Sequence, residues 1–185
     1  PAGPRVAIVT NAGGPGILCA DACEAEGLVV PVLSPATQER LRKFLPVHAA
    51  VSNPVDLVAS APAEHYREAV AAVGADPNVD AVVVIFVPPL VTQAEDVAQA
   101  IVEGVARWPD HKPVLTVFMS ARGVPELLRR SHLRIPSYAF PESAARALAH
   151  AVRYGQWRRR PAEPAARPAD ARRDEALALV ATAVE

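Results

Sequence analysis

Arg5-Val-Ala-Ile-Val-Thr-Asn-Ala-Gly-Gly-Pro-Gly16 stands near the start of the chain and predicts a strand, a loop and the beginning of a helix. The apolar run Val6–Val9 is bounded by a turn, which predicts a buried strand of a parallel sheet. Residues 10–16 predict a tight glycine-rich loop. Ile17–Glu26 has helical spacing, and Gly27 is placed to cap its C-terminus.

A strand, a glycine-rich loop and a helix in this order direct several main-chain N–H groups at one point. The positive end of the helix dipole faces the same point, so the arrangement is typical of an anion site, most often a phosphate site. The alternative is a plain strand-to-helix turn that needs glycine only for its bend.

The glycine pattern differs from the usual nucleotide-binding motifs. Cys19 stands where the third glycine of a dinucleotide fingerprint belongs, and the next apolar run ends at Ser34 rather than at an acidic residue. No Lys-Ser/Thr pair follows the glycines, which excludes a Walker loop. A phosphate bound here is therefore not expected to arrive on a dinucleotide.

Composition excludes several classes of protein. The 185 residues fit one domain of about 150 residues plus an appendage. A net charge of −1 gives no general attraction to nucleic acid, and no apolar run or signal peptide points to a membrane, so a cytoplasmic location is expected. Cys19 and Cys23 are expected to be reduced thiols rather than a disulfide or a metal pair. The chain begins without Met, which favours a piece of a longer protein.

Apolar runs and helical patterns alternate along the rest of the chain. Further strands are predicted at residues 28–33, 79–87, 114–119 and 137–140, and helices at 35–44, 62–74, 93–108, 124–131 and 141–155. The fold class is therefore α/β, a doubly wound parallel sheet in three αβα layers with the flavodoxin-like strand order 2-1-3-4-5. Three loops should converge at the carboxyl ends of the strands: residues 10–16, 87–92 and 120–123.

The tail has a different composition. Residues 156–170 are rich in Pro and Arg, which predicts an exposed linker after a domain at 1–155. Residues 171–185 predict a short helix with Leu177, Leu179 and Val180 on its apolar side. That helix has no strand to cover in this domain, so we expect it to lead into a following domain.

Five segments together resemble a known family. They are the quoted stretch, Asn53-Pro-Val-Asp-Leu57, residues 79–85, 113–115 and 136–148, in the order found in the second flavodoxin-like domain of NDP-forming acyl-CoA synthetases. These enzymes are relatives of succinyl-CoA synthetase, so the resemblance implies a succinyl-CoA ligase-like fold. The tail helix resembles the lead-in to their ATP-grasp domain, which is absent here.

The resemblance implies a role in handling a phosphohistidine. In this family an acyl phosphate passes its phosphoryl group to a histidine, which passes it to a nucleoside diphosphate while CoA takes the acyl group. Two helices point their N-termini at that histidine, one from each flavodoxin-like domain. In this chain the role maps to the helix after the glycine-rich loop, with a phosphate-binding set of Asn11, Ala12, Gly13, Gly14 and Gly16. Glycine suits this role because the phosphate must approach the main chain itself.

The histidine would come from a neighbouring domain, since none of the five histidines here has a matching small-residue loop. Asn53 and Asp56 are candidates to support the phosphate loop; local turn capping is the alternative for Asn53. No metal ligands are expected. The fragment itself is expected to bind no cofactor and to be inactive alone, while CoA, ATP/ADP and Mg are implied for the full-length enzyme.

The expected partners are the CoA-binding, phosphohistidine and ATP-grasp domains of the same protein, with no nucleic acid or membrane, and a homodimer is left open. Two other functions remain as alternatives. One is a non-catalytic regulatory module fused to a protein acetyltransferase, since similar regions occur in such fusions. The other is a flavin-binding flavodoxin, against which the absence of a Ser/Thr-rich phosphate loop argues.

Overall fold

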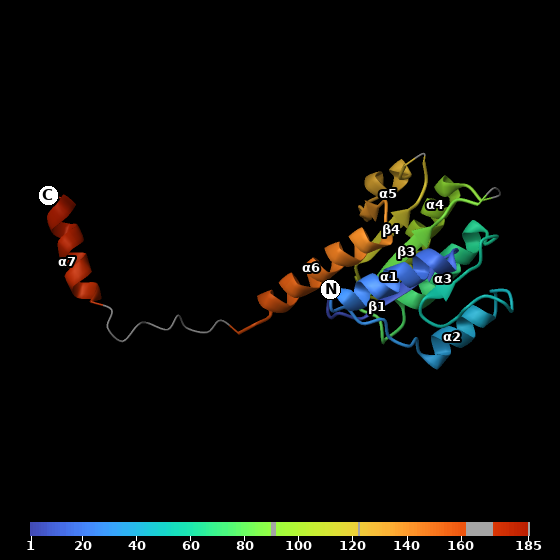
Figure 1. Cartoon of the computed structure of the whole chain (residues 1–185), viewed down its shortest axis with the longest axis horizontal. Helices are drawn as coiled ribbons and strands as arrows, with labels where there is room; N and C mark the ends of the chain where they lie inside the picture. The colour runs from blue at the N-terminus through green and yellow to red at the C-terminus, as the bar shows by residue number, and fades with distance from the viewer. Residues whose placement is uncertain (90–91, 122, 162–171, 185) are drawn as a thin grey trace.

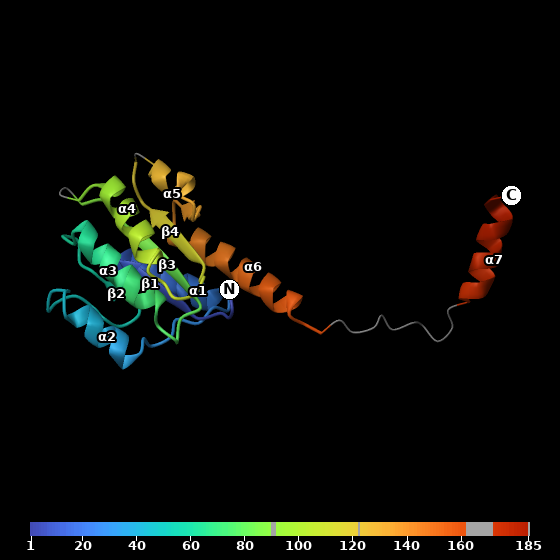
Figure 2. The same cartoon turned by 180° about the vertical axis from the view of Figure 1, so that it is seen from behind.

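A five-stranded, all-parallel sheet forms the centre of the molecule (Figures 1 and 2). The structure is a computed structural model that describes residues 1–89, 92–121, 123–161 and 172–184. The strand order is β2-β1-β3-β4-β5, which confirms the predicted doubly wound α/β fold. The strands are β1 (Val6–Thr10), β2 (Val55–Asp56), β3 (Ala81–Phe86), β4 (Val114–Phe118) and β5 (Ser137–Tyr138).

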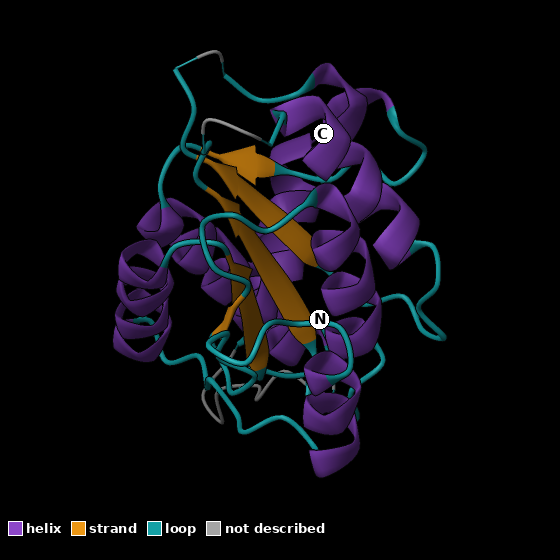
Figure 3. Ribbon diagram, turned by 90° about the vertical axis from the view of Figure 1, so that its right-hand side faces the viewer, coloured by secondary structure: helices purple, strands orange, loops and turns teal. Residues whose placement is uncertain are grey.

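Helices cover both faces of the sheet, as Figure 3 shows. The helices are α1 (Gly13–Ala25), α2 (Pro35–Arg42), α3 (Ala63–Gly74), α4 (Ala94–Val105), α5 (Glu126–Arg130), α6 (Pro141–Arg158) and α7 (Arg173–Val184). On β1, Val6 and Ile8 pack in one core cluster with side chains of α1 and α6. Ala7 and Val9 pack in the other cluster with side chains of α2, α3, α4 and α5. This alternation gives each face of the sheet its own core.

The predicted strand at residues 28–33 is wrong. Only Val29 forms an isolated bridge there, with Arg5, and the Val6 N–H donates to the Val29 carbonyl at 2.7 Å. The outer partner of β1 is instead β2, which lies between the helices predicted at 35–44 and 62–74. The numbered order 2-1-3-4-5 is confirmed, but its second strand is Val55–Asp56.

The Asn53 side chain fills the gap along β1 between Val29 and β2. Its Oδ1 accepts the Ile8 N–H at 2.9 Å, and its Nδ2 donates to the Val6 carbonyl at 2.9 Å. The same Nδ2 donates to the Pro31 carbonyl at 3.0 Å. The Asn53 carboxamide thus forms the hydrogen bonds that a neighbouring strand would form with β1, and the Val6 carbonyl and the Ile8 N–H do not remain unpaired.

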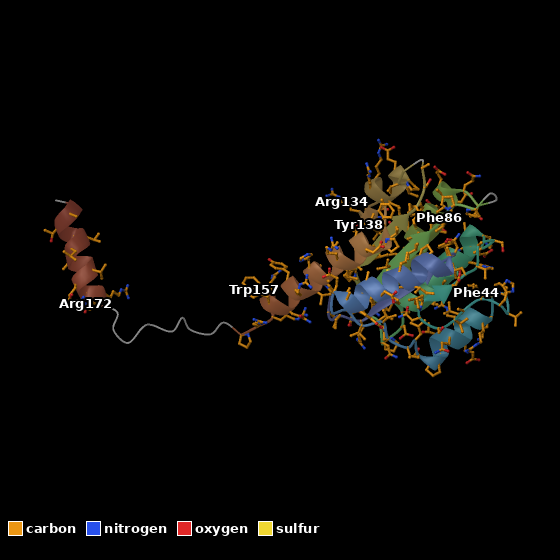
Figure 4. The ribbon with its side chains drawn as sticks, in the orientation of Figure 1. Phe44, Phe86, Arg134, Tyr138, Trp157 and Arg172 are labelled. Carbon is orange, nitrogen blue, oxygen red and sulfur yellow. The ribbon has the colours of Figure 1, made fainter. Side chains whose placement is uncertain are left out.

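The last helices extend past the sheet. α6 continues to Arg158 rather than ending at Gly155, and Arg159 donates to the carbonyls of Pro1 and Ala2 at 3.1 and 2.9 Å. Figure 4 shows Trp157 on the end of α6 that points away from the sheet, where its ring stacks with that of Tyr154. α7 lies apart from the sheet (Figure 1). Most of the predicted linker, residues 162–170, lies outside the described residues.

Candidate functional site

The glycine-rich stretch is mostly helix rather than loop. α1 begins at Gly13, four residues before the predicted start at Ile17. Pro15 is accepted in the first turn because main-chain N–H groups there have no partner within the helix. None of the three glycines in this turn has a positive φ; among the described glycines only Gly27 and Gly123 do. Left-handed backbone is therefore not the reason for glycine here.

Two main-chain donors remain open at the start of α1. The N–H of Ala12, which precedes the helix, donates to Thr10 Oγ1 at 3.0 Å, and the Gly16 N–H donates to the Ala12 carbonyl at 3.2 Å. Proline has no N–H. Within the described chain no acceptor meets the N–H of Gly13 or Gly14, and both residues are exposed. These two N–H groups, with the positive end of the helix dipole, form a site that favours an anion.

The three glycines of this turn have three different surroundings. A Cβ on Gly16 would lie 3.0 Å from Thr10 Cγ2 and 3.6 Å from Pro54 Cβ, so glycine allows close packing there. A Cβ on Gly13 would lie 3.2 Å from Asp56 Oδ2. A Cβ on Gly14 would meet no atom within 4 Å. Space for an approaching ligand therefore lies at Gly14, whereas Gly16 is buried and its N–H is already bonded.

Asn11 connects this turn to the next strand of the sheet. Its Oδ1 accepts the Val87 N–H at 2.9 Å, and its Nδ2 donates to the Val87 carbonyl at 2.8 Å. Val87 is the first residue after β3. The loops at residues 10–16 and 87–92 thus meet at the carboxyl edge of the sheet.

The third predicted loop lies at the same edge. A cavity of about 560 Å³ separates the chain after β3 from the chain after β4. Its described lining includes Val87, Pro88, Thr92, Met119, Ser120 and Gly123. The predicted convergence of loops therefore holds for the described residues of all three.

The two predicted supporting residues have different positions. Asp56, at the end of β2, lies beside the start of α1; its Oδ1 accepts the Val58 N–H at 3.0 Å, and its Oδ2 faces Gly13. Asn53 bonds the main chain of β1 and of Pro31 rather than the glycine-rich turn. Asp56 therefore lies beside the glycine-rich turn, whereas Asn53 lies farther away, alongside β1.

Two exposed apolar side chains lie in α1 directly after its glycines. Ile17 and Leu18, which follow the glycines directly, are 62% and 50% exposed. On the inner side of the helix Cys19 and Cys23 are fully buried free thiols. A hydrogen bond between these two thiols, together with burial, raises the pKa of Cys19 far above its usual range.

Two residues that position this turn were missed from the sequence. Thr10 is fully buried, and its Oγ1 both accepts the Ala12 N–H and donates to the Ala12 carbonyl, each at 3.0 Å. A threonine three residues before a helix start is a recognisable signal for such a turn. Val87 contributes through its main chain, so its residue type gives no indication of this contact.

The described residues contain no metal centre and no membrane-spanning helix. No group of three or more His, Cys, Asp or Glu side chains gathers among them to hold a metal ion. None of the described helices combines the length and apolarity needed to cross a bilayer.

Comparison with known proteins places the chain in a family. The profile of the Ligase-CoA domain matches residues 6–162. The ADP-forming acetate–CoA ligase II subunit alpha of Pyrococcus furiosus is 44% identical over 153 residues, which is 80% of this chain and 33% of that protein. The ADP-forming acetate–CoA ligase of Methanocaldococcus jannaschii is 34% identical over 155 residues, 81% of this chain and 22% of that protein.

Solved structures agree with the sequence comparison. A crystal structure from Pyrococcus horikoshii OT3 has a TM-score of 0.79 and 40% identity, covering 84% of this chain and 37% of that one. The dinucleotide-forming acetyl-coenzyme A synthetase 1 of Ca. Korarchaeum cryptofilum has a TM-score of 0.77 and 29% identity, covering 85% of this chain and 35% of that one. It is also solved in complex with phosphate and ADP. The chain spans about a third of the Pyrococcus furiosus relative. This chain therefore belongs to the Ligase-CoA domain family of the NDP-forming acyl-CoA synthetases, with the flavodoxin-like fold that its sequence predicts.

Proposed function

We propose that this chain is the phosphate-handling domain of an enzyme that converts an acid, CoA and ATP to acyl-CoA, ADP and phosphate. The start of α1 would receive the phosphoryl group of a phosphohistidine that a neighbouring domain supplies. One observation carries the proposal: Gly13 and Gly14 are exposed, and their N–H groups have no acceptor in the described chain. The names of the similar ligases and the phosphate complex of one synthetase support it.

The chemical task of the site is to stabilise negative charge. A phosphoryl group carries negative charge on its oxygens, and Gly13 and Gly14 can each donate an N–H to one of them. Both donors are part of a helix that is already folded, so they need no reorganisation when the group arrives. Main-chain donors also add no full positive charge, so the phosphoryl group is held weakly enough to pass on.

Exposed apolar side chains on the helices that begin at this edge support the proposal that another domain docks here. Ile17 and Leu18 on α1 are exposed, and so is Phe140, which directly precedes α6 and is 60% exposed. α1 follows β1 and α6 follows β5, so both helices begin at the carboxyl edge of the parallel sheet, and they share one core cluster on the same face of it. Covering these side chains by the domain that carries the histidine would exclude water from the phosphoryl group.

The rest of the enzyme is assigned to other domains. In this proposal residues 1–155 form the phosphate-handling domain, 156–170 the linker and 171–185 the lead-in to an ATP-grasp domain. ATP, Mg²⁺ and CoA would bind to those other domains, and the reaction would take place in the cytoplasm. The described residues themselves gather no acidic cluster that would hold Mg²⁺.

Inorganic phosphate is the direct probe of the site. Titration of the ¹⁵N-labelled chain should shift the amide resonances of Gly13 and Gly14 in a saturable, weak response. The Gly14→Ala variant separates ligand approach from folding. Its methyl group meets no protein atom, yet it points toward the N-terminus of the helix, where the phosphate would sit. We expect at least a fivefold loss of affinity, about 1 kcal/mol, with no loss of stability.

Gly155→Ala is the matched control. It makes the same change inside α6, where a Cβ would only touch the Pro1 carbonyl and Arg159 at 3.4 and 3.5 Å. Its phosphate affinity should equal that of the wild type. Saturable shifts confined to other parts of the chain, or equal affinity in wild type and Gly14→Ala, would overturn the proposal.

A further inference from the structure

Both the oxygen and the nitrogen of the Asn11 carboxamide form hydrogen bonds with the main chain of a single residue. Val87 receives a hydrogen bond from Asn11 Nδ2 and gives one to Asn11 Oδ1, at 2.8 and 2.9 Å. Asn11 is only 2% exposed. A side chain that is buried and bonded at both ends does not face an anion that approaches through solvent.

The position of Val87 makes this pair a link between two strands. Thr10 pairs with Ile85 in the parallel ladder of β1 and β3, so Asn11 and Val87 lie just past the end of that ladder. There the two strands separate, because β1 leads into α1 and β3 leads toward α4. The Asn11 side chain therefore holds together the two chains at the point where ligands gather in open parallel sheets.

The same residue stands two positions before the first open donor. Ala12, between Asn11 and Gly13, is held by two hydrogen bonds to Thr10 Oγ1. Asn11 is fixed to Val87, directly after β3, and Ala12 is fixed to Thr10 of β1. The direction in which the Gly13 and Gly14 N–H groups point is therefore set by the ends of these two strands. We infer that Asn11 is a positioning residue, which fixes these donors through Val87 and does not itself contact the phosphate.

This inference rests on the proposed phosphate role of α1, and it makes different predictions from a role as ligand. If Asn11 positions the donors, its removal allows the turn before α1 to relax. Part of the free energy of phosphate binding is then used to order the turn again. We expect Asn11→Ala to weaken phosphate binding about tenfold. A ligand role would instead require the Asn11 carboxamide to leave Val87 and bond the phosphate.

The test follows the side-chain amide of Asn11 in the ¹⁵N-labelled wild-type chain during titration with inorganic phosphate. We expect the Gly13 and Gly14 resonances to shift while both Asn11 Nδ2 proton signals keep their positions. This measurement needs no variant, so it decides the question even if Asn11→Ala does not fold. Large saturable shifts of the Asn11 side-chain signals would overturn the inference in favour of direct contact.

Variants supply the second arm. Asn78→Ala is the control, because it removes another asparagine that donates to a main-chain carbonyl, that of Val32 at 3.2 Å, at the opposite end of β3. Its phosphate affinity should stay within about twofold of the wild type. Unchanged affinity in Asn11→Ala would overturn the positioning role. No saturable response of Gly13 and Gly14 in the wild type would instead overturn the proposed phosphate site.

Discussion

The carboxylate of Asp56 lies against the main chain of Gly13 at the start of α1. Its Oδ2 is 3.2 Å from the position that a Cβ on Gly13 would occupy, and its Oδ1 is held by the Val58 N–H. Gly13 thus makes room for a carboxylate, whereas Gly14 leaves room for a ligand. A carboxylate at this end of a helix stabilises the helix, because it interacts favourably with the positive end of the helix dipole. The same charge repels an anion that binds to the neighbouring N–H groups.

Replacing Asp56 by asparagine should strengthen the binding of inorganic phosphate. The amide keeps the size of the side chain and removes the like charge, which at this separation and partial exposure corresponds to about a threefold to tenfold gain in affinity at low salt. Calorimetric titration at two ionic strengths checks the result, since screening should reduce the gain at high salt. Asp110→Asn, on an exposed residue at the amino end of β4, should leave the affinity unchanged. A weaker affinity in Asp56→Asn would show that the carboxylate supports the bound anion.

The packing of Trp108 on Gly74 gives a prediction about stability. The indole ring lies in the space that a Gly74 side chain would need, and its Nε1 donates to the Val70 carbonyl at 2.9 Å. Gly74→Ala should displace the ring and lower the free energy of unfolding by about 1–3 kcal/mol, measured by urea denaturation. Gly14→Ala, which meets no atom, should not lower it. An equal loss in the two variants would show that helix glycine content, and not the indole contact, determines stability.

The Arg5–Asp80 pair predicts how stability depends on pH. Arg5 donates to Asp80 through Nε at 2.9 Å, Nη2 at 2.8 Å and its main-chain N–H at 3.1 Å. The hydrogen bonds from the Arg5 side chain lower the pKa of Asp80 below the usual 3.8. Because the unfolded chain takes up this proton more readily, the pair stabilises the fold above about pH 4 and loses that contribution as the pH falls through the lower folded pKa.

Asp80→Asn should therefore destabilise the chain at pH 7 by about 1–3 kcal/mol. The difference between variant and wild type should shrink between pH 4 and pH 2, as followed by denaturant titrations at several pH values. Asp174→Asn, on an exposed residue of α7, should show no such difference. A gap that stays constant down to pH 2 would assign the loss to packing rather than to the charge of Asp80.

The central part of the fold could be predicted from the sequence for a simple reason. Residues 81–86 form a continuous apolar run and residues 114–118 one interrupted only by Thr116, and such runs are typical of strands that are buried on both faces. Glycine and proline then mark the turns between strands and helices. Alternation of the two patterns leaves a parallel sheet as the natural arrangement.

The segment at residues 28–33 shows where sequence reasoning fails. Leu28 and Leu33 are buried, as an apolar run predicts, but Val29 and Val32 are 49% and 74% exposed. The segment packs without pairing as a strand beyond Val29, because the Asn53 carboxamide bonds the Val6 carbonyl and the Ile8 N–H. That bond joins residues 45 positions apart, so no local pattern reveals it.

The site was only partly predictable from the sequence. The residue types of the glycine-rich turn indicated main-chain donors, and two exposed ones are present. The start of α1 at Gly13 was missed because glycine and proline usually oppose helix formation, although Pro15 loses nothing in a first turn. The Asn11–Val87 link spans 76 positions, and it depends on β1 and β3 being neighbours in the sheet.

Two truncations test where the domain ends. Deleting residues 162–185 removes α7, whose described side chains are exposed, and should change the free energy of unfolding by less than about 0.5 kcal/mol. Deleting residues 156–185 also removes Trp157 and Arg159, and with them the ring contact to Tyr154 and the hydrogen bonds to Pro1 and Ala2. That shorter chain should lose about 1–2 kcal/mol, which lowers the thermal midpoint by roughly 2–8 °C. Equal midpoints for the two truncations would place the boundary at Gly155. A large loss of stability on deleting residues 162–185 would show that α7 packs on the domain in solution.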